Sequence, residues 1–134
     1  MLRQRIYIRK YDWLVYVFYD TDSTDADEIL SLLRHIGCRE KNLSDSGKSL
    51  RNGIDNTGLT FSNNRLRESV MVIGRASSLS EFLDTWQHEL THLQRHICRT
   101  YGIDPYSEEA AYLAGDIAKR MHPLLSHFMC ECGM

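Results

Sequence analysis

Residues 79–101 are the stretch that most constrains the fold, because they have the pattern of one long amphipathic helix. Ser78 and Glu81 fit a capping box at its start, and Tyr101-Gly102 supplies a stop signal at its end. The apolar residues recur in steps of three and four: Leu79, Phe82, Leu83, Trp86, Leu90, Leu93 and Ile97. Such a stripe needs a second layer to cover it, so we expect this helix to pack on a sheet.

The pentapeptide His88-Glu89-Leu90-Thr91-His92 lies inside this helix and has the pattern HExxH. Positions four apart lie on one face of a helix, so the two imidazoles can converge on a single zinc ion. The glutamate between them can reach a metal-bound water and act as its general base. We expect His88, Glu89 and His92 to share the face opposite the apolar stripe. The alternative is a surface helix with incidental histidines.

A third protein ligand is expected on a later element, because a catalytic zinc usually takes three ligands and keeps one position open. Pro105 and Ser107 mark the start of a second helix, and Glu108 and Glu109 follow in its first turn. Either carboxylate can serve as that ligand. The alternative is that both only complement the helix dipole.

The arrangement resembles the gluzincin type of zinc metallopeptidase, in which HExxH is followed by a glutamate on the next helix. It looks more closely like the small, single-domain metallopeptidases of bacteria and their phages. The resemblance covers residues 56–115, and its most specific parts are the HExxH motif and the segment 108–113, Glu-Glu-Ala-Ala-Tyr-Leu. It implies zinc bound by His88, His92 and Glu108, with Glu89 as the base. Two departures are a shorter spacing to the glutamate than in large gluzincins and the lack of an evident substrate-binding domain.

The resemblance implies hydrolysis of peptide bonds in a peptide or protein substrate, with Glu89 assisting the attack of a metal-bound water. Such enzymes commonly add a Tyr or His that donates to the oxyanion, and the candidates here are Tyr101, Tyr106, Tyr112 and His96. Asp84 and Asp116 are candidate carboxylates behind the metal-binding histidines. The alternative is a catalytically weak or inactive zincin-like metal-binding protein that binds a protein partner, as a phage or mobile-element accessory protein does.

A metzincin site is excluded, because its pattern HExxHxxGxxH requires glycine and histidine where this chain has Arg95 and Cys98. We interpret His96 as a solvated side chain rather than a partner of the metal ligands. Cys98 is interpreted as a small buried hydrophobe.

Length and composition indicate one domain over residues 1–134, with 43% hydrophobic and 25% charged residues. A net charge of −2 argues against a nucleic-acid partner. The sequence has no run of 18 apolar residues and does not start with a signal-peptide core, so we expect no membrane span and a cytoplasmic location. The four cysteines are then expected to be thiols, with Cys130 and Cys132 in a frayed tail.

The rest of the chain indicates an α+β fold, namely a minimal zincin-like domain. Strands are predicted over residues 5–8, 14–19, 57–62 and 68–73, and a helix begins at residues 25–28 and ends at Gly37. Residues 39–56 are predicted to form a polar loop. The small mixed sheet would pack on the HExxH helix, with the glutamate-bearing helix following. If the resemblance holds, the strand at 57–62 or at 68–73 is the edge strand that lines the cleft.

Overall fold

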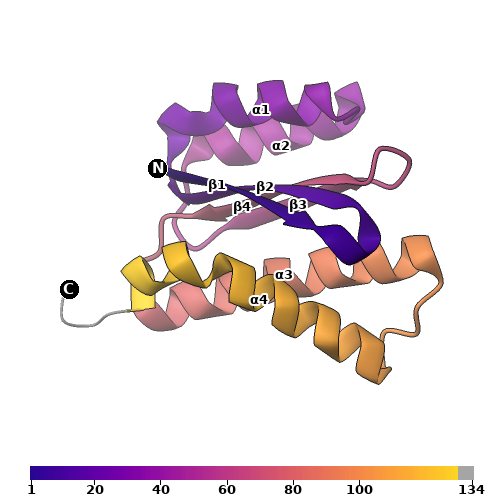
Figure 1. The fold of residues 1–134 in the computed structure, drawn as a ribbon. Coiled ribbons are helices and arrows are strands. Elements are labelled where there is room, and N and C mark those ends of the chain that lie inside the picture. Colours follow the sequence, from indigo (N-terminus) through magenta and orange to yellow (C-terminus); the bar gives the residue numbers. More distant parts are fainter. Residues whose placement is uncertain (130–134) are drawn as a thin grey trace.

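Four strands form one mixed sheet in the order β1-β2-β4-β3 (Figure 1). In the computed structural model, which describes residues 1–129, the strands are Leu2–Ile8 (β1), Trp13–Thr21 (β2), Gly58–Asn63 (β3) and Glu68–Gly74 (β4). β2 and β4 run parallel at the centre, whereas β1 and β3 pair antiparallel at the two edges. The two central strands are the most buried, which explains their nearly continuous runs of apolar residues.

The helices cover both faces of this sheet (Figure 1). The helices α1 (Ala26–His35) and α2 (Glu40–Asn52) lie on one face, and α3 (Leu79–Tyr101) and α4 (Glu108–Met129) lie on the other. Two short 3-10 turns, η1 (Arg9–Tyr11) and η2 (Ser23–Asp25), follow β1 and β2. The α+β class predicted from the sequence is confirmed.

Two hydrophobic cores result, because successive side chains of a strand point to opposite faces. On β4, Met71 and Ile73 belong to the core under α3 and α4, whereas Val70 and Val72 belong to the core under α1 and α2. Leu93 of α3 is fully buried in the first core, as the apolar stripe predicts.

The predicted loop over residues 39–56 is wrong, since most of it forms α2. Serines, asparagine and glycine give this segment a weak intrinsic helix preference, which is why its sequence resembles a loop. Leu43 and Leu50 are seven residues apart and therefore share one face, with the buried Gly47 between them. Burial of this face stabilises a helix that local propensity alone does not favour.

The HExxH helix has the predicted bounds. Ser78 Oγ accepts a hydrogen bond from the Glu81 N–H, and Gly102 ends the helix in the left-handed conformation at φ +66°. Cys38 and Cys98 are buried free thiols, and burial raises the pKa of each. Cys130 and Cys132 lie outside the described residues.

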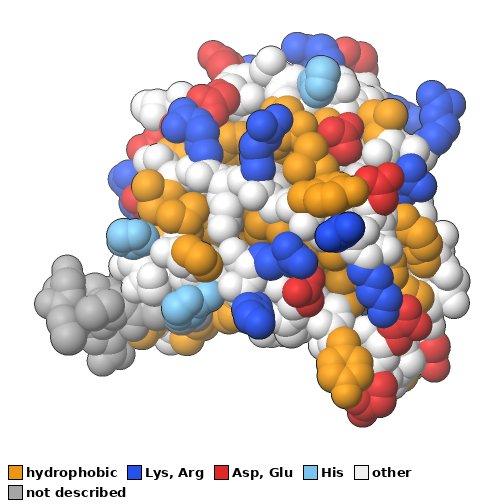
Figure 2. Space-filling view, viewed as in Figure 1, with side chains coloured by type: hydrophobic (Ala, Val, Ile, Leu, Met, Phe, Trp, Pro, Cys, Tyr) orange, Lys and Arg blue, Asp and Glu red, His pale blue; other side chains and the backbone are white. Residues whose placement is uncertain are grey.

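On the face shown in Figure 2, Lys and Arg side chains lie among Asp and Glu side chains. Ion pairs such as Arg3–Glu28 join side chains of opposite charge on the surface, and both partners of that pair are about half exposed. Exposed pairs of this kind contribute at most about 1 kcal/mol each to stability. Within residues 1–129, no helix has the length and apolar character needed to cross a membrane.

Candidate functional site

His88 and His92 meet on the outer face of α3. Their Nε2 atoms are 3.1 Å apart, and the rings are edge-on with centroids separated by 4.7 Å. His88 is exposed and His92 is half-buried. The helical spacing therefore brings the two imidazoles together as the motif predicts.

Glu89 is not on the exposed face where the sequence placed it. Only 4% of this residue is exposed, because α3 lies against the edge strand β3 on that side. Thr60 Oγ1 of β3 donates a hydrogen bond to Glu89 Oε1 at 2.7 Å. The buried arc of α3 is therefore wider than the apolar stripe, and it includes the glutamate of the motif.

Gly58 of β3 gives the Glu89 carboxylate its space. A Cβ at this position would lie 2.7 Å from Glu89 Oε2 and 2.8 Å from its Cγ, which is too close for any other residue without a shift. Three residues of β3 thus face α3: Gly58, which has no side chain, and Thr60 and Ser62, whose hydroxyls hydrogen-bond to it. This strand presents small, polar groups to the motif.

His96, one turn beyond His92, is held by a chain of hydrogen-bonded side chains that leads into the core. Its Nδ1 lies 2.7 Å from Ser62 Oγ, which lies 2.6 Å from Ser69 Oγ. Ser69 Oγ in turn accepts a hydrogen bond from Trp13 Nε1 at 2.8 Å, and both Ser69 and Trp13 are fully buried. The interpretation of His96 as a solvated side chain is therefore wrong. Burial lowers its pKa, and the nearby His92 and Arg99 lower it further.

This contact was missed because Ser62 and His96 are 34 residues apart in the chain. The sequence did contain one indication of it. Each of two neighbouring predicted strands contains a serine, Ser62 in one and Ser69 in the other. Serine is uncommon at fully buried positions unless it is hydrogen-bonded.

Among residues 1–129, none joins the histidine pair as a third ligand. Glu108 is exposed at the start of α4, and no cluster of three or more His, Cys, Asp or Glu side chains suited to a metal occurs within residues 1–129. Glu109 is engaged elsewhere, since it accepts a hydrogen bond from Tyr11 at 3.0 Å and lies 3.7 Å from Lys10 Nζ. Glu108 as the third ligand therefore stays a prediction.

The predicted oxyanion donors and the predicted carboxylates behind the histidines lie in different parts of the structure. Asp84 lines a shallow depression with both histidines of the motif, but it makes no hydrogen bond or ion pair within the described part of the chain. Asp116 pairs with Arg120 on α4. Tyr101 donates to the Tyr11 carbonyl, and the exposed Tyr106 and Tyr112 lie on the α3–α4 loop and on α4. His96 is the candidate oxyanion donor that lies on the same helix face as the histidine pair.

The residues present fit part of a zinc site. Two nitrogens bound to one tetrahedral zinc at about 2.0–2.1 Å lie about 3.3–3.4 Å apart. The observed 3.1 Å between the Nε2 atoms of His88 and His92 is close to that value. Gly58 leaves space for the carboxylate of Glu89, the residue that lies between the two histidines in the motif.

Comparison with known proteins found no matching protein-family model, no matching curated protein and no matching solved structure. The geometry of the described residues is therefore the basis for a functional proposal.

Proposed function

We propose that this protein is a zinc-dependent peptidase of zincin-like type, with His88 and His92 as metal ligands and Glu89 as the general base. The observation that carries the proposal is the combination on α3 of two convergent imidazoles and a buried, supported carboxylate between them in sequence. Glu108 is proposed as the third ligand on the sequence resemblance alone.

Each side chain then has a distinct task. A bound zinc ion supplies Lewis acidity toward water and the scissile carbonyl. Glu89 takes a proton from the attacking water and delivers it to the leaving amine. Thr60 holds one oxygen of that carboxylate at 2.7 Å, and Gly58 leaves room beside the other oxygen.

His96 is suited to a role beside these groups. Ser62 holds its Nδ1, so Nε2 is the ring atom left to donate to the carbonyl oxygen of a substrate. The buried chain through Ser69 to Trp13 fixes the orientation of the ring.

The edge strand of the sheet supports a peptide as the substrate. β4 lies between β2 and β3, so the predicted alternative at 68–73 is not an edge, and β3 is the edge strand next to α3. The pairing of Thr57 O with Gly74 N–H directs the main chain of Gly58, Thr60 and Ser62 away from β4. An extended peptide can pair with these free groups beside Glu89.

Metal analysis and one substitution test the proposal. We expect zinc to co-purify with the protein at one ion per chain and to be lost in His92→Ala. Glu89→Gln should keep the zinc but lower the hydrolysis of fluorescent casein by roughly 10²–10⁴-fold, because the general base is gone. Zinc-free protein, or a Glu89→Gln variant as active as wild type, would refute the peptidase proposal.

The assignment of the third ligand can be tested with two neighbouring carboxylates, one as the test and the other as its control. Glu108→Gln should weaken zinc binding, whereas Glu109→Gln should leave it unchanged because Glu109 contacts Tyr11 and Lys10. Equal zinc affinity in wild type and Glu108→Gln would remove Glu108 from the ligand set.

A second candidate function is metal binding without turnover, in which the protein binds a protein partner. The absence of a third metal-binding side chain beside His88 and His92 within residues 1–129 favours this candidate. Zinc retained in both wild type and Glu89→Gln, with no casein hydrolysis by either, is the result expected for it.

A further inference from the structure

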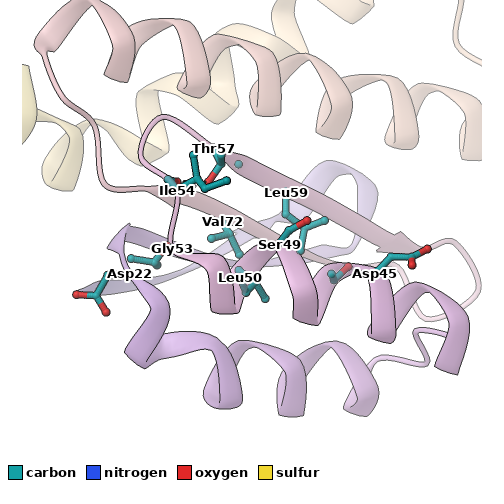
Figure 3. A pocket seen from close by; sticks show the side chains of 12 residues that line it. Asp22, Asp45, Ser49, Leu50, Gly53, Ile54, Thr57, Leu59 and Val72 are labelled. Atoms are coloured by element: carbon teal, nitrogen blue, oxygen red, sulfur yellow. Dashed lines mark hydrogen bonds between the residues drawn. The ribbon is translucent and has the colours of Figure 1, made fainter.

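A groove lies between α2 and β3, on the sheet face opposite the HExxH helix (Figure 3). Its volume is about 210 Å³. Figure 3 shows an elongated space with Asp22 and Asp45 at opposite ends and Leu50, Leu59 and Val72 between them. The peptidase proposal makes no use of this groove.

The polar groups of the groove are unequally engaged. Asp22 accepts hydrogen bonds from Thr24 and pairs with Arg75 at 3.2 Å, and these contacts hold the pKa of its carboxyl below the usual value. In contrast, the side chains of Asp45, Ser46 and Ser49 have no hydrogen-bond or ion-pair partner within residues 1–129. Asp45 is thus the carboxylate that remains available at one end.

The lining matches one class of side chain. Leu50, Leu59 and Val72 give apolar surface along the middle of the groove, and no lysine or arginine of the described residues lines it. Lysine and arginine bury an aliphatic stem against apolar surface while their charged ends stay near water or a carboxylate. A lysine or arginine lying along the groove would bring its charge to Asp45.

The pairing of β3 determines which residues of a bound strand reach the groove. A residue of an added strand has its side chain on the same face as the β3 residue opposite it. Residues opposite Gly58 and Thr60 therefore face α3 and Glu89, whereas the residue opposite Leu59 faces α2. One extended peptide thus presents alternate side chains to the HExxH site and to the groove.

We propose that the α2–β3 groove binds the side chain of a lysine or arginine in a peptide paired with β3. This residue is the sequence neighbour of the one that faces Glu89. The inference deepens the proposed peptidase function, on which it rests, by assigning a basic residue to the substrate next to the reacting segment.

Three peptides test the proposal without altering the protein. Each is a fluorescein-labelled heptapeptide of alternating valine and threonine, with lysine, norleucine or glutamate at its centre. Binding is measured by fluorescence anisotropy with metal-free protein, so that turnover does not interfere. The lysine peptide should bind about three- to fivefold more tightly than the norleucine peptide, as expected for one exposed ion pair, and the glutamate peptide should bind most weakly.

Matched variants of α2 locate the effect. Asp45→Asn should abolish the preference for lysine over norleucine, whereas Glu40→Gln, which removes an exposed carboxylate outside the groove, should preserve it. Ser49→Trp fills the groove. It should weaken the binding of both the lysine and the norleucine peptide by at least about tenfold, because the apolar contact with the groove is lost. Ser44→Trp adds the same ring to an exposed position outside the groove and should leave binding unchanged.

The outcomes separate this proposal from the peptidase proposal. Equal affinities for the three peptides, or no binding of any of them, would overturn the groove assignment even if zinc and Glu89-dependent hydrolysis are present. A lysine preference lost in Asp45→Asn would support the groove even if the protein proves to bind peptides without cutting them.

Discussion

Glu89 is the residue on which the proposed chemistry depends, and its position is unusual for a carboxylate. It is 4% exposed, and its side-chain hydrogen bond within the described residues comes from Thr60. Burial of an ionisable group is costly unless hydrogen bonds support it. Such a position is retained more readily where a functional role requires it, and the role proposed for Glu89 is that of a general base.

Replacing Gly58 by alanine should disturb Glu89 directly. The added Cβ would lie 2.7 Å from Oε2, and the carboxylate cannot easily move because Thr60 holds its other oxygen. We expect a loss of about 1–3 kcal/mol in the free energy of unfolding, measured by urea denaturation.

Gly115→Ala is the matched control for this change. No atom of residues 1–129 lies within 4 Å of a Cβ at Gly115 in α4, so the same substitution should raise the free energy of unfolding by up to about 1 kcal/mol through helix propensity. A Gly58→Ala variant as stable as wild type would show that Gly58 and Thr60 do not confine the side chain of Glu89.

His96 gives a pH-dependent contribution to stability. Burial lowers its pKa in the folded protein, so the unfolded chain binds more protons than the folded one below the ordinary histidine pKa of about 6.5. The free energy of unfolding should therefore fall as the pH drops through about 6.5 toward the lower folded pKa, and it should be fully restored above pH 6.5.

His96→Asn isolates this contribution, because asparagine can still hydrogen-bond to Ser62 but does not titrate. Urea denaturation at pH 7.5 and at pH 5 measures how much the free energy of unfolding falls between the two pH values. This fall should be smaller in the variant than in wild type. The same loss in both proteins would contradict a lowered pKa for His96.

At the level of elements, β3 joins the two proposed sites. One of its faces presents Gly58, Thr60 and Ser62 to α3, and the other presents Leu59 to the α2–β3 groove. Its pairing with β4 leaves every second residue with a free main chain at the edge of the sheet. A peptide paired with this edge, as proposed, would have its position relative to Glu89 set by β3 and α3.

This alternation predicts a period-two pattern of amide hydrogen exchange in β3. The N–H groups of Leu59 and Phe61 point to β4 and should exchange slowly, whereas those of Gly58, Thr60 and Ser62 should exchange fast. NMR-detected exchange measures each amide, and the lysine heptapeptide should slow the fast set. Protection of the opposite set would contradict the register of β3 on β4.

At the scale of the whole molecule, the proposed metal site lies on a helix whose other faces are part of a core. Leu90, Leu93 and Ile97 of α3 pack with β2, β4 and α4. A ligand that binds only the folded chain stabilises the whole molecule by mass action. Zinc binding at His88 and His92 should consequently affect global unfolding.

Zinc at one hundred times its dissociation constant should raise the free energy of unfolding by about 2.7 kcal/mol. For a chain of this size the increase corresponds to a rise of about 10 °C in the unfolding temperature. Differential scanning calorimetry with and without zinc measures it, and His88→Ala should remove the shift. A zinc-induced shift that persists in His88→Ala would place the ion elsewhere.

The sequence by itself determined the features that depend on neighbours along the chain. The cap at Ser78, the stop at Gly102 and the helical period fix the ends and the faces of α3, and the spacing of four brings His88 to His92. The four strands were likewise predicted, with ends that differ by at most three residues, because their apolar runs and turns are local signals.

Only the tertiary structure decided what depends on contacts between distant segments. The helix α2 forms because its weak apolar face is buried, Glu89 is enclosed because β3 lies beside α3, and His96 is held because Ser62 faces it across 34 residues of sequence. The absence of a third ligand beside the histidine pair within residues 1–129 is of the same kind. Helical spacing is set by local geometry, whereas the distance between two elements is set by how their side chains pack.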